Sequence, residues 1–102
     1  MIGKLSKLKV ISIAESQISD INPLGDLVNL KQLILSKNNI SDIAILAEIK
    51  SLEILWLDNN KITDISPLKD LPNLKNLIIK GNPIADTKQI EDLKSAGVEV
   101  DF

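Results

Sequence analysis

Apolar residues follow one pattern through most of the chain, in which short segments alternating leucine or isoleucine with variable residues recur every 22 positions. In Leu33-Ile34-Leu35, for example, the first and third side chains fall on one face of an extended segment. One short strand per 22 residues, always running in the same direction, predicts a parallel sheet of stacked coils. The aligned apolar columns are Leu8, Leu30, Leu52 and Leu74; Ile11, Leu33, Leu55 and Leu77; and Ile13, Leu35, Leu57 and Ile79.

Asparagine follows three of these segments at the same spacing, as Asn38, Asn60 and Asn82. An amide both donates and accepts hydrogen bonds, so it can satisfy backbone groups on its own coil and on the next one. We therefore predict a structural asparagine ladder rather than a ligand site. Ser16 occupies this column in the first repeat and offers fewer hydrogen bonds.

Aspartate forms a second polar column, just before the segments in which the chain turns back. A short carboxylate can accept backbone N–H groups there, and proline at 23 and 67 suits a tight 3₁₀ turn. Capping therefore explains this row of acids better than metal binding or acid–base chemistry. Its members are Asp20, Asp42, Asp64 and Asp86.

The repeat reads L-x-x-L-x-L-x-x-N-x-I-x-D-I-x-P-L-x-x-L-x-x and resembles the 22-residue form of the leucine-rich repeat. Residues 19–24 and 63–68 most resemble the internalin-type repeats of bacterial surface proteins. The resemblance implies an α/β leucine-rich repeat solenoid: a right-handed superhelix with a parallel β-sheet on its concave face and short 3₁₀ or turn segments on its convex side. It predicts one domain over residues 1–102, with repeats at about 5–26, 27–48, 49–70 and 71–85.

The pattern changes after the fourth repeat, where a C-terminal cap of a helix and a strand is predicted over about 86–102. Asp86 and Gln89 have the spacing of a capping box, and Ile90 and Leu93 share a helical face. Gly97 is placed to end the helix. The alternating residues 98–102 then predict a final strand.

The first repeat is preceded by only a few residues, whereas internalin-like proteins carry a helical cap there. Terminal repeats need a polar outer face for solubility. We therefore expect this end to self-associate, as a homodimer packed end to end, or to have been cut from a longer array. A monomer with a frayed first repeat is the alternative. The apolar residues expected at this end are Leu5, Leu8, Ile11 and Ile13.

The resemblance assigns the variable strand positions to the concave face, where these repeats bind other proteins. Its middle column holds Ile34, Trp56 and Ile78, and Trp56 is the chain's single tryptophan. Tryptophan is enriched in binding hot spots, so we predict a contact patch for a protein or peptide. The alternative is that the two isoleucines merely shelter the indole. The predicted contact residues are Gln32, Ile34, Ile54, Trp56, Asp58, Asn76, Ile78 and Lys80.

Composition narrows the function classes further. The chain has no cysteine or histidine, which removes thiolate metal sites and the usual nucleophilic relays. All 12 basic residues are lysine and the formal net charge is −2, which argues against nucleic-acid binding. The apolar segments are too short for membrane insertion. We therefore expect a non-catalytic domain without cofactor or metal.

Three classes of interaction protein stay open. The first is a fragment of a bacterial surface or secreted adhesin, favoured by the two D-I-x-P-L segments. The second is an intracellular regulatory scaffold subunit, favoured by the lack of a leader and of cysteine. The third is an engineered or truncated repeat scaffold without a natural ligand. Departures from a strict consensus, such as Ser16, Ala44 and Ile45, favour a natural or lightly trimmed sequence.

Overall fold

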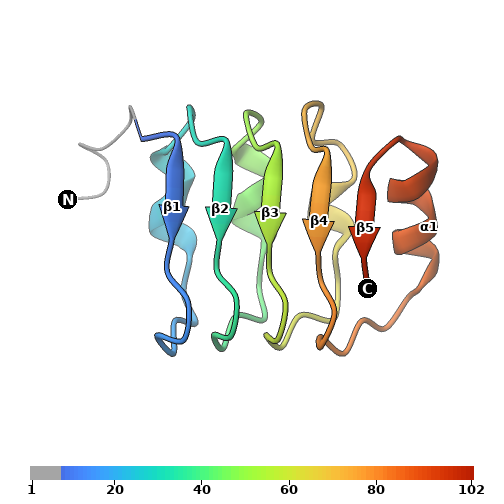
Figure 1. Ribbon diagram of the computed structural model, residues 1–102, viewed down its shortest axis with the longest axis horizontal. Helices are drawn as coiled ribbons and strands as arrows, with labels where there is room; N and C mark the ends of the chain where they lie inside the picture. Colours follow the sequence, from blue (N-terminus) through green and yellow to red (C-terminus); the bar gives the residue numbers. More distant parts are fainter. Residues whose placement is uncertain (1–7) are drawn as a thin grey trace.

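The computed structural model describes residues 8–102 and contains one five-stranded parallel sheet in the order β1 to β5. Figure 1 shows the strands side by side, with an α-helix beyond the last strand at the C-terminal end of the stack. This arrangement confirms the predicted leucine-rich repeat solenoid. The strands are β1 (Val10–Ser12), β2 (Gln32–Ile34), β3 (Ile54–Trp56), β4 (Asn76–Ile78) and β5 (Glu99–Asp101).

The central residue of each strand points inward, as the apolar columns predict. Leu33, Leu55 and Leu77 are paired in register across β2, β3 and β4, and each is buried. Successive side chains of a strand point to opposite faces, so the flanking residues face outward. The inward columns therefore form one continuous core shared between neighbouring coils.

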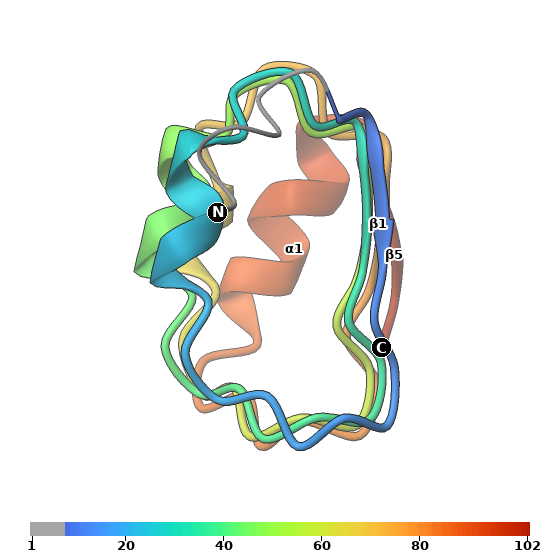
Figure 2. The same cartoon turned by 90° about the vertical axis from the view of Figure 1, so that its left-hand side faces the viewer.

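Within residues 8–102, three 3₁₀ helices lie on the side opposite the sheet: η2 (Asn22–Asp26), η3 (Ala44–Glu48) and η4 (Ser66–Leu68). Figure 2, which looks along the stack, shows these turns on one side of the coil and the strands on the other. The predicted role of the aspartates as caps is confirmed. In each coil a backbone N–H two residues later donates to the aspartate Oδ1 at 2.9–3.0 Å, as at Asp20, Asp42, Asp64 and Asp86.

The C-terminal coil contains helix α1 (Lys88–Ser95), which buries Ile90 and Leu93 against the core. Gly97 ends the helix as predicted, with φ of 96°, a conformation that a side chain disfavours. The N–H of Gly97 donates to the carbonyl of Lys94 at 3.0 Å, and that of Val98 donates to Leu93 at 3.1 Å. This pair of bonds is a Schellman motif, and it directs the chain into β5.

The predicted capping box is wrong in one of its two hydrogen bonds, the one expected from the Gln89 side chain. Gln89 does not return to the start of its own helix. Its Oε1 accepts from the N–H of Ile65 at 2.9 Å, and its Nε2 donates to Oδ1 of Asp64 at 2.8 Å. Gln89 therefore fastens the helical cap to the preceding coil, because that coil offers a backbone donor and a carboxylate within reach.

Candidate functional site

The outward face of the sheet, here called the sheet face, carries the predicted contact residues in rows across the strands. The central row pairs Ser12, Ile34, Trp56, Ile78 and Asp101 in register from β1 to β5. Trp56 is 38% exposed, whereas Leu55 next to it is fully buried. The indole therefore belongs to the surface and not to the core.

The neighbouring row brings together three more of the predicted residues. Gln32, Ile54 and Asn76 lie side by side in register on β2, β3 and β4, and Glu99 follows on β5. Ile34 and Ile78 flank Trp56 as half-buried neighbours. The centre of the sheet face is therefore apolar, with polar side chains in the adjacent row.

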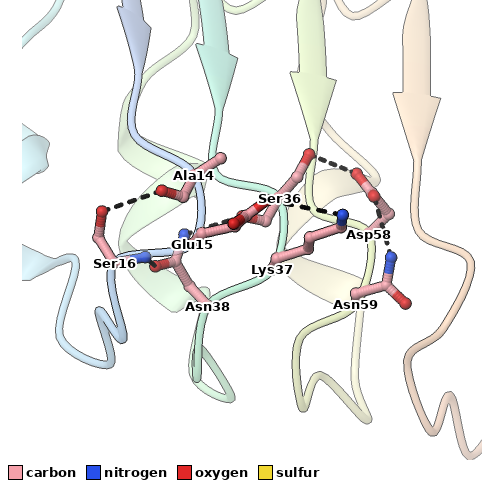
Figure 3. Close-up of polar contacts among 8 residues, drawn as sticks. All are labelled: Ala14, Glu15, Ser16, Ser36, Lys37, Asn38, Asp58 and Asn59. Carbon is pink, nitrogen blue, oxygen red and sulfur yellow. Dashed lines mark hydrogen bonds and ion pairs between the residues drawn. The ribbon is translucent and has the colours of Figure 1, made fainter.

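Polar contacts tie down the residues that follow the strands (Figure 3). Ser36 Oγ donates to Asp58 Oδ1 at 2.6 Å, and Asn59 Nδ2 donates to Asp58 Oδ2 at 3.1 Å. Lys37 Nζ lies 3.6 Å from Glu15 Oε1 in the row beyond. Asp58 is thus held at the rim of the sheet face instead of standing free for a ligand.

A charged row that was not predicted from the repeat pattern lies at the other end of the strands. Glu53 stands between two lysines, with Lys31 Nζ at 3.1 Å from Oε2 and Lys75 Nζ at 3.7 Å from Oε1. The hydrogen bond and charge of Lys31, aided by the charge of Lys75, lower the pKa of the Glu53 carboxyl below its ordinary value. Alternating charges at 22-residue spacing were the signal for this row.

The three ladder asparagines repeat one set of hydrogen bonds from coil to coil. Asn60 Nδ2 donates to the carbonyls of Leu57 at 2.9 Å and of Leu35 at 3.0 Å, one on its own coil and one on the coil before. Its Oδ1 accepts from the N–H of Ile40 at 3.1 Å. Asn38 and Asn82 make the equivalent bonds. These amides are occupied by backbone groups, which keeps the corner of each coil fixed.

A second set of corner contacts precedes the strands and was not predicted. Ser51 Oγ donates to the carbonyl of Leu30 at 2.6 Å, and Asn73 Nδ2 donates to the carbonyl of Lys50 at 3.1 Å. Both bonds reach back to the previous coil. The column of small polar residues at positions 29, 51 and 73 was the sequence signal for them.

The residues predicted to self-associate lie at the first coil, except that Leu5 lies outside the described residues. Leu8 and Ile11 are half-buried, and Ile13 is 38% exposed. Ile13 and Leu35 contribute to a mainly apolar hollow of about 150 Å³ at this end of the stack. Among the described residues, the inward side chains of this first coil therefore pack against another coil on one side only, the side of β2.

Residues 8–102 contain no group of three or more acidic side chains placed to hold a metal ion together. None of the helices described in this range combines the length and the apolar character needed to cross a membrane.

Comparisons with known proteins agree with this architecture. The family described as Leucine Rich repeats (2 copies) matches residues 6–48 and 50–95. No curated protein matches the sequence. Among solved structures, an internalin (inlF) of Listeria monocytogenes is similar over 90% of this chain, with 33% identity and a TM-score of 0.83.

Two other solved structures show the same likeness. Internalin C2 of Listeria monocytogenes covers 90% of the chain at 37% identity with a TM-score of 0.78. A leucine-rich repeat protein of Leptospira interrogans covers 99% at 27% identity with a TM-score of 0.86. The chain spans 27% of the internalin (inlF) structure, 41% of internalin C2 and 27% of the Leptospira protein.

Proposed function

The chain belongs to the leucine-rich repeat family, and from that premise we propose that it is a non-catalytic module that binds a protein or peptide through the sheet face around Trp56. Such repeats are typical of protein–protein interaction modules. The likeness to Listeria internalins supports placing the module in a bacterial surface or secreted protein.

One observation carries this proposal: Trp56 stands exposed in the middle of the sheet face. Folding does not require a tryptophan at a solvent-facing strand position, since smaller β-formers serve there. A large aromatic side chain between Ile34 and Ile78 offers the apolar centre that interface hot spots have. Between these two isoleucines, Trp56 remains 38% exposed, so part of the residue is available for contact.

The size of the sheet limits the kind of partner. Five strands about 4.8 Å apart, each of three residues with a rise of about 3.3 Å, give a flat area of about 200 Å². A standard protein interface buries about 800 Å² on each partner. The module therefore binds a short peptide segment through this face alone, or a larger partner with the help of the loops that follow the strands.

Capture experiments with immobilised variants test the proposal. We expect proteins retained from a cell extract by the wild type to be lost with Trp56→Ala, whose affinity falls by at least about thirtyfold. The control Val28→Ala, which removes an apolar side chain that is 57% exposed and lies outside the strands, should retain them. Equal capture by Trp56→Ala would contradict a binding role for the sheet face.

A second candidate function is self-association through the first coil, favoured by the apolar hollow beside Ile13. Light scattering after size exclusion should then show a mass that rises with concentration above 11.2 kDa. Ile13→Lys should restore the monomer, because a charge in an apolar interface is costly to desolvate. A constant monomer mass at high concentration would count against this candidate.

A further inference from the structure

A groove of about 260 Å³ runs beside Trp56 on the sheet face. Trp56 on β3 forms one wall, and Glu99 and Asp101 on β5 form the other. The floor between them is β4, which contributes Asn76 and Ile78. Two strand spacings separate the walls, about 9.6 Å between backbones.

The size of this groove suits one long side chain of a partner. Small-molecule pockets usually enclose about 300–1,000 Å³. The groove, at about 260 Å³, is smaller than such pockets. It also lies open on the sheet face, where a partner's backbone can pass over it.

The charges around the groove favour a cation. Lys80 Nζ lies 3.7 Å from Asp101 Oδ2, and both side chains are more than half exposed, so water screens this pair strongly. Within residues 8–102, Glu99 forms no ion pair. The three charged groups therefore leave one excess negative charge beside a groove that Trp56 also lines, and an indole attracts cations to its ring face.

We propose that this groove holds an arginine side chain of the partner, an inference that rests on the proposed binding function of the sheet face. The methylene groups lie over Ile78, and the planar guanidinium stacks against Trp56. Its N–H groups donate to the carboxylates of Glu99 and Asp101. Arginine suits the groove better than lysine because its planar fork both stacks and makes paired hydrogen bonds.

The test uses N-acetyl-arginine amide as the probe and N-acetyl-citrulline amide as its neutral isostere. Trp56 is the only tryptophan, so its indole N–H signal in NMR and its fluorescence report on the surroundings of this one residue, which lines the groove. We expect the arginine probe, at millimolar concentrations, to shift the indole signal. The citrulline probe should bind about tenfold more weakly.

Two double variants carry the same change of charge at different places. Glu99→Gln with Asp101→Asn should abolish the preference for arginine, because it removes both carboxylates and keeps the shape of the groove. The control, Glu91→Gln with Asp92→Asn, alters two exposed residues of α1 and should preserve the preference. Lys80→Gln should strengthen arginine binding, because it releases Asp101.

Several outcomes would overturn the inference: no shift of the indole signal, equal affinity for the two probes, or a preference that survives loss of both groove carboxylates. Equal loss in the α1 control would do the same, by showing general attraction to an acidic protein. If Trp56→Ala loses captured proteins while the groove variant retains them, the arginine site fails and the binding function stands. If the groove instead prefers arginine while Trp56→Ala still captures the same proteins, the arginine site stands and the proposed binding function fails.

Discussion

Replacement of Asn60 by alanine is expected to lower the free energy of unfolding by about 2–3 kcal/mol. Asn60 donates to three carbonyls, and each of them keeps another donor. Leu35 also accepts from Asn38, Leu57 from Asn82, and Asp58 from the N–H of Lys37. The N–H of Ile40 instead loses the acceptor that Asn60 provides, and Ile40 is fully buried. The cost is therefore mainly that of one buried, unsatisfied donor.

Urea unfolding followed by Trp56 fluorescence measures this loss. Asn39→Ala is the matched control, since this exposed asparagine lies outside the ladder, and we expect it to change stability by no more than about 0.5 kcal/mol. Asn60→Asp should also destabilise, because a carboxylate keeps the bond from Ile40 but cannot donate to the three carbonyls. Equal stability of Asn60→Ala and Asn39→Ala would refute a structural role for the ladder.

Leu55→Ala is expected to have the largest effect, a loss of about 2–5 kcal/mol. Leu55 is fully buried in the central strand between Leu33 and Leu77, so truncation leaves a cavity that two neighbouring coils share. A domain of this size has only about 5–15 kcal/mol of total stability. The variant should therefore unfold at much lower urea concentration.

The neighbouring residue provides the control for Leu55. Ile54→Ala removes an equally large side chain from the outward, half-buried position of the same strand. We expect less than half the loss seen at Leu55, measured by circular dichroism and fluorescence together. Similar losses at both positions would mean that the two faces of β3 are equally buried, which would undermine the orientation assigned to Trp56.

The 22-residue periodicity was sufficient to predict the coils, because each inward leucine occupies the same environment as its counterparts one turn away. The aspartate caps were predictable for the same reason, since each carboxylate bonds a backbone group two residues away. Gln89 was not, because its partners Ile65 and Asp64 lie on another coil. Spacing along the sequence predicts contacts between residues a few positions apart. It does not show which side chains and backbone groups of different coils lie within hydrogen-bonding distance.

The groove beside Trp56 also escaped prediction, because the repeat length changes at the last coil. The register places Trp56 22 residues after Ile34, but Asp101 lies 23 residues after its partner Ile78. A strict 22-residue period would have placed Val100 beside Ile78, so the wall of the groove formed by β5 would have been apolar. The coil that contains α1 is one residue longer, which turns Asp101 outward and Val100 toward the core.

The asparagine ladder has an evolutionary consequence. Asn60 donates to the carbonyl of Leu35 on the preceding coil, and Asn82 donates to the carbonyl of Leu57 in the same way. Neighbouring coils are therefore joined by the same hydrogen bond at each step of the stack. An in-frame duplication of residues 39–60 would add a coil that makes the same hydrogen bonds to its neighbours as the existing coils do. It would also place a second tryptophan side chain beside Trp56. Unequal crossing-over within the gene can therefore enlarge the sheet face by one whole coil at a time, with each new coil folding as its neighbours do.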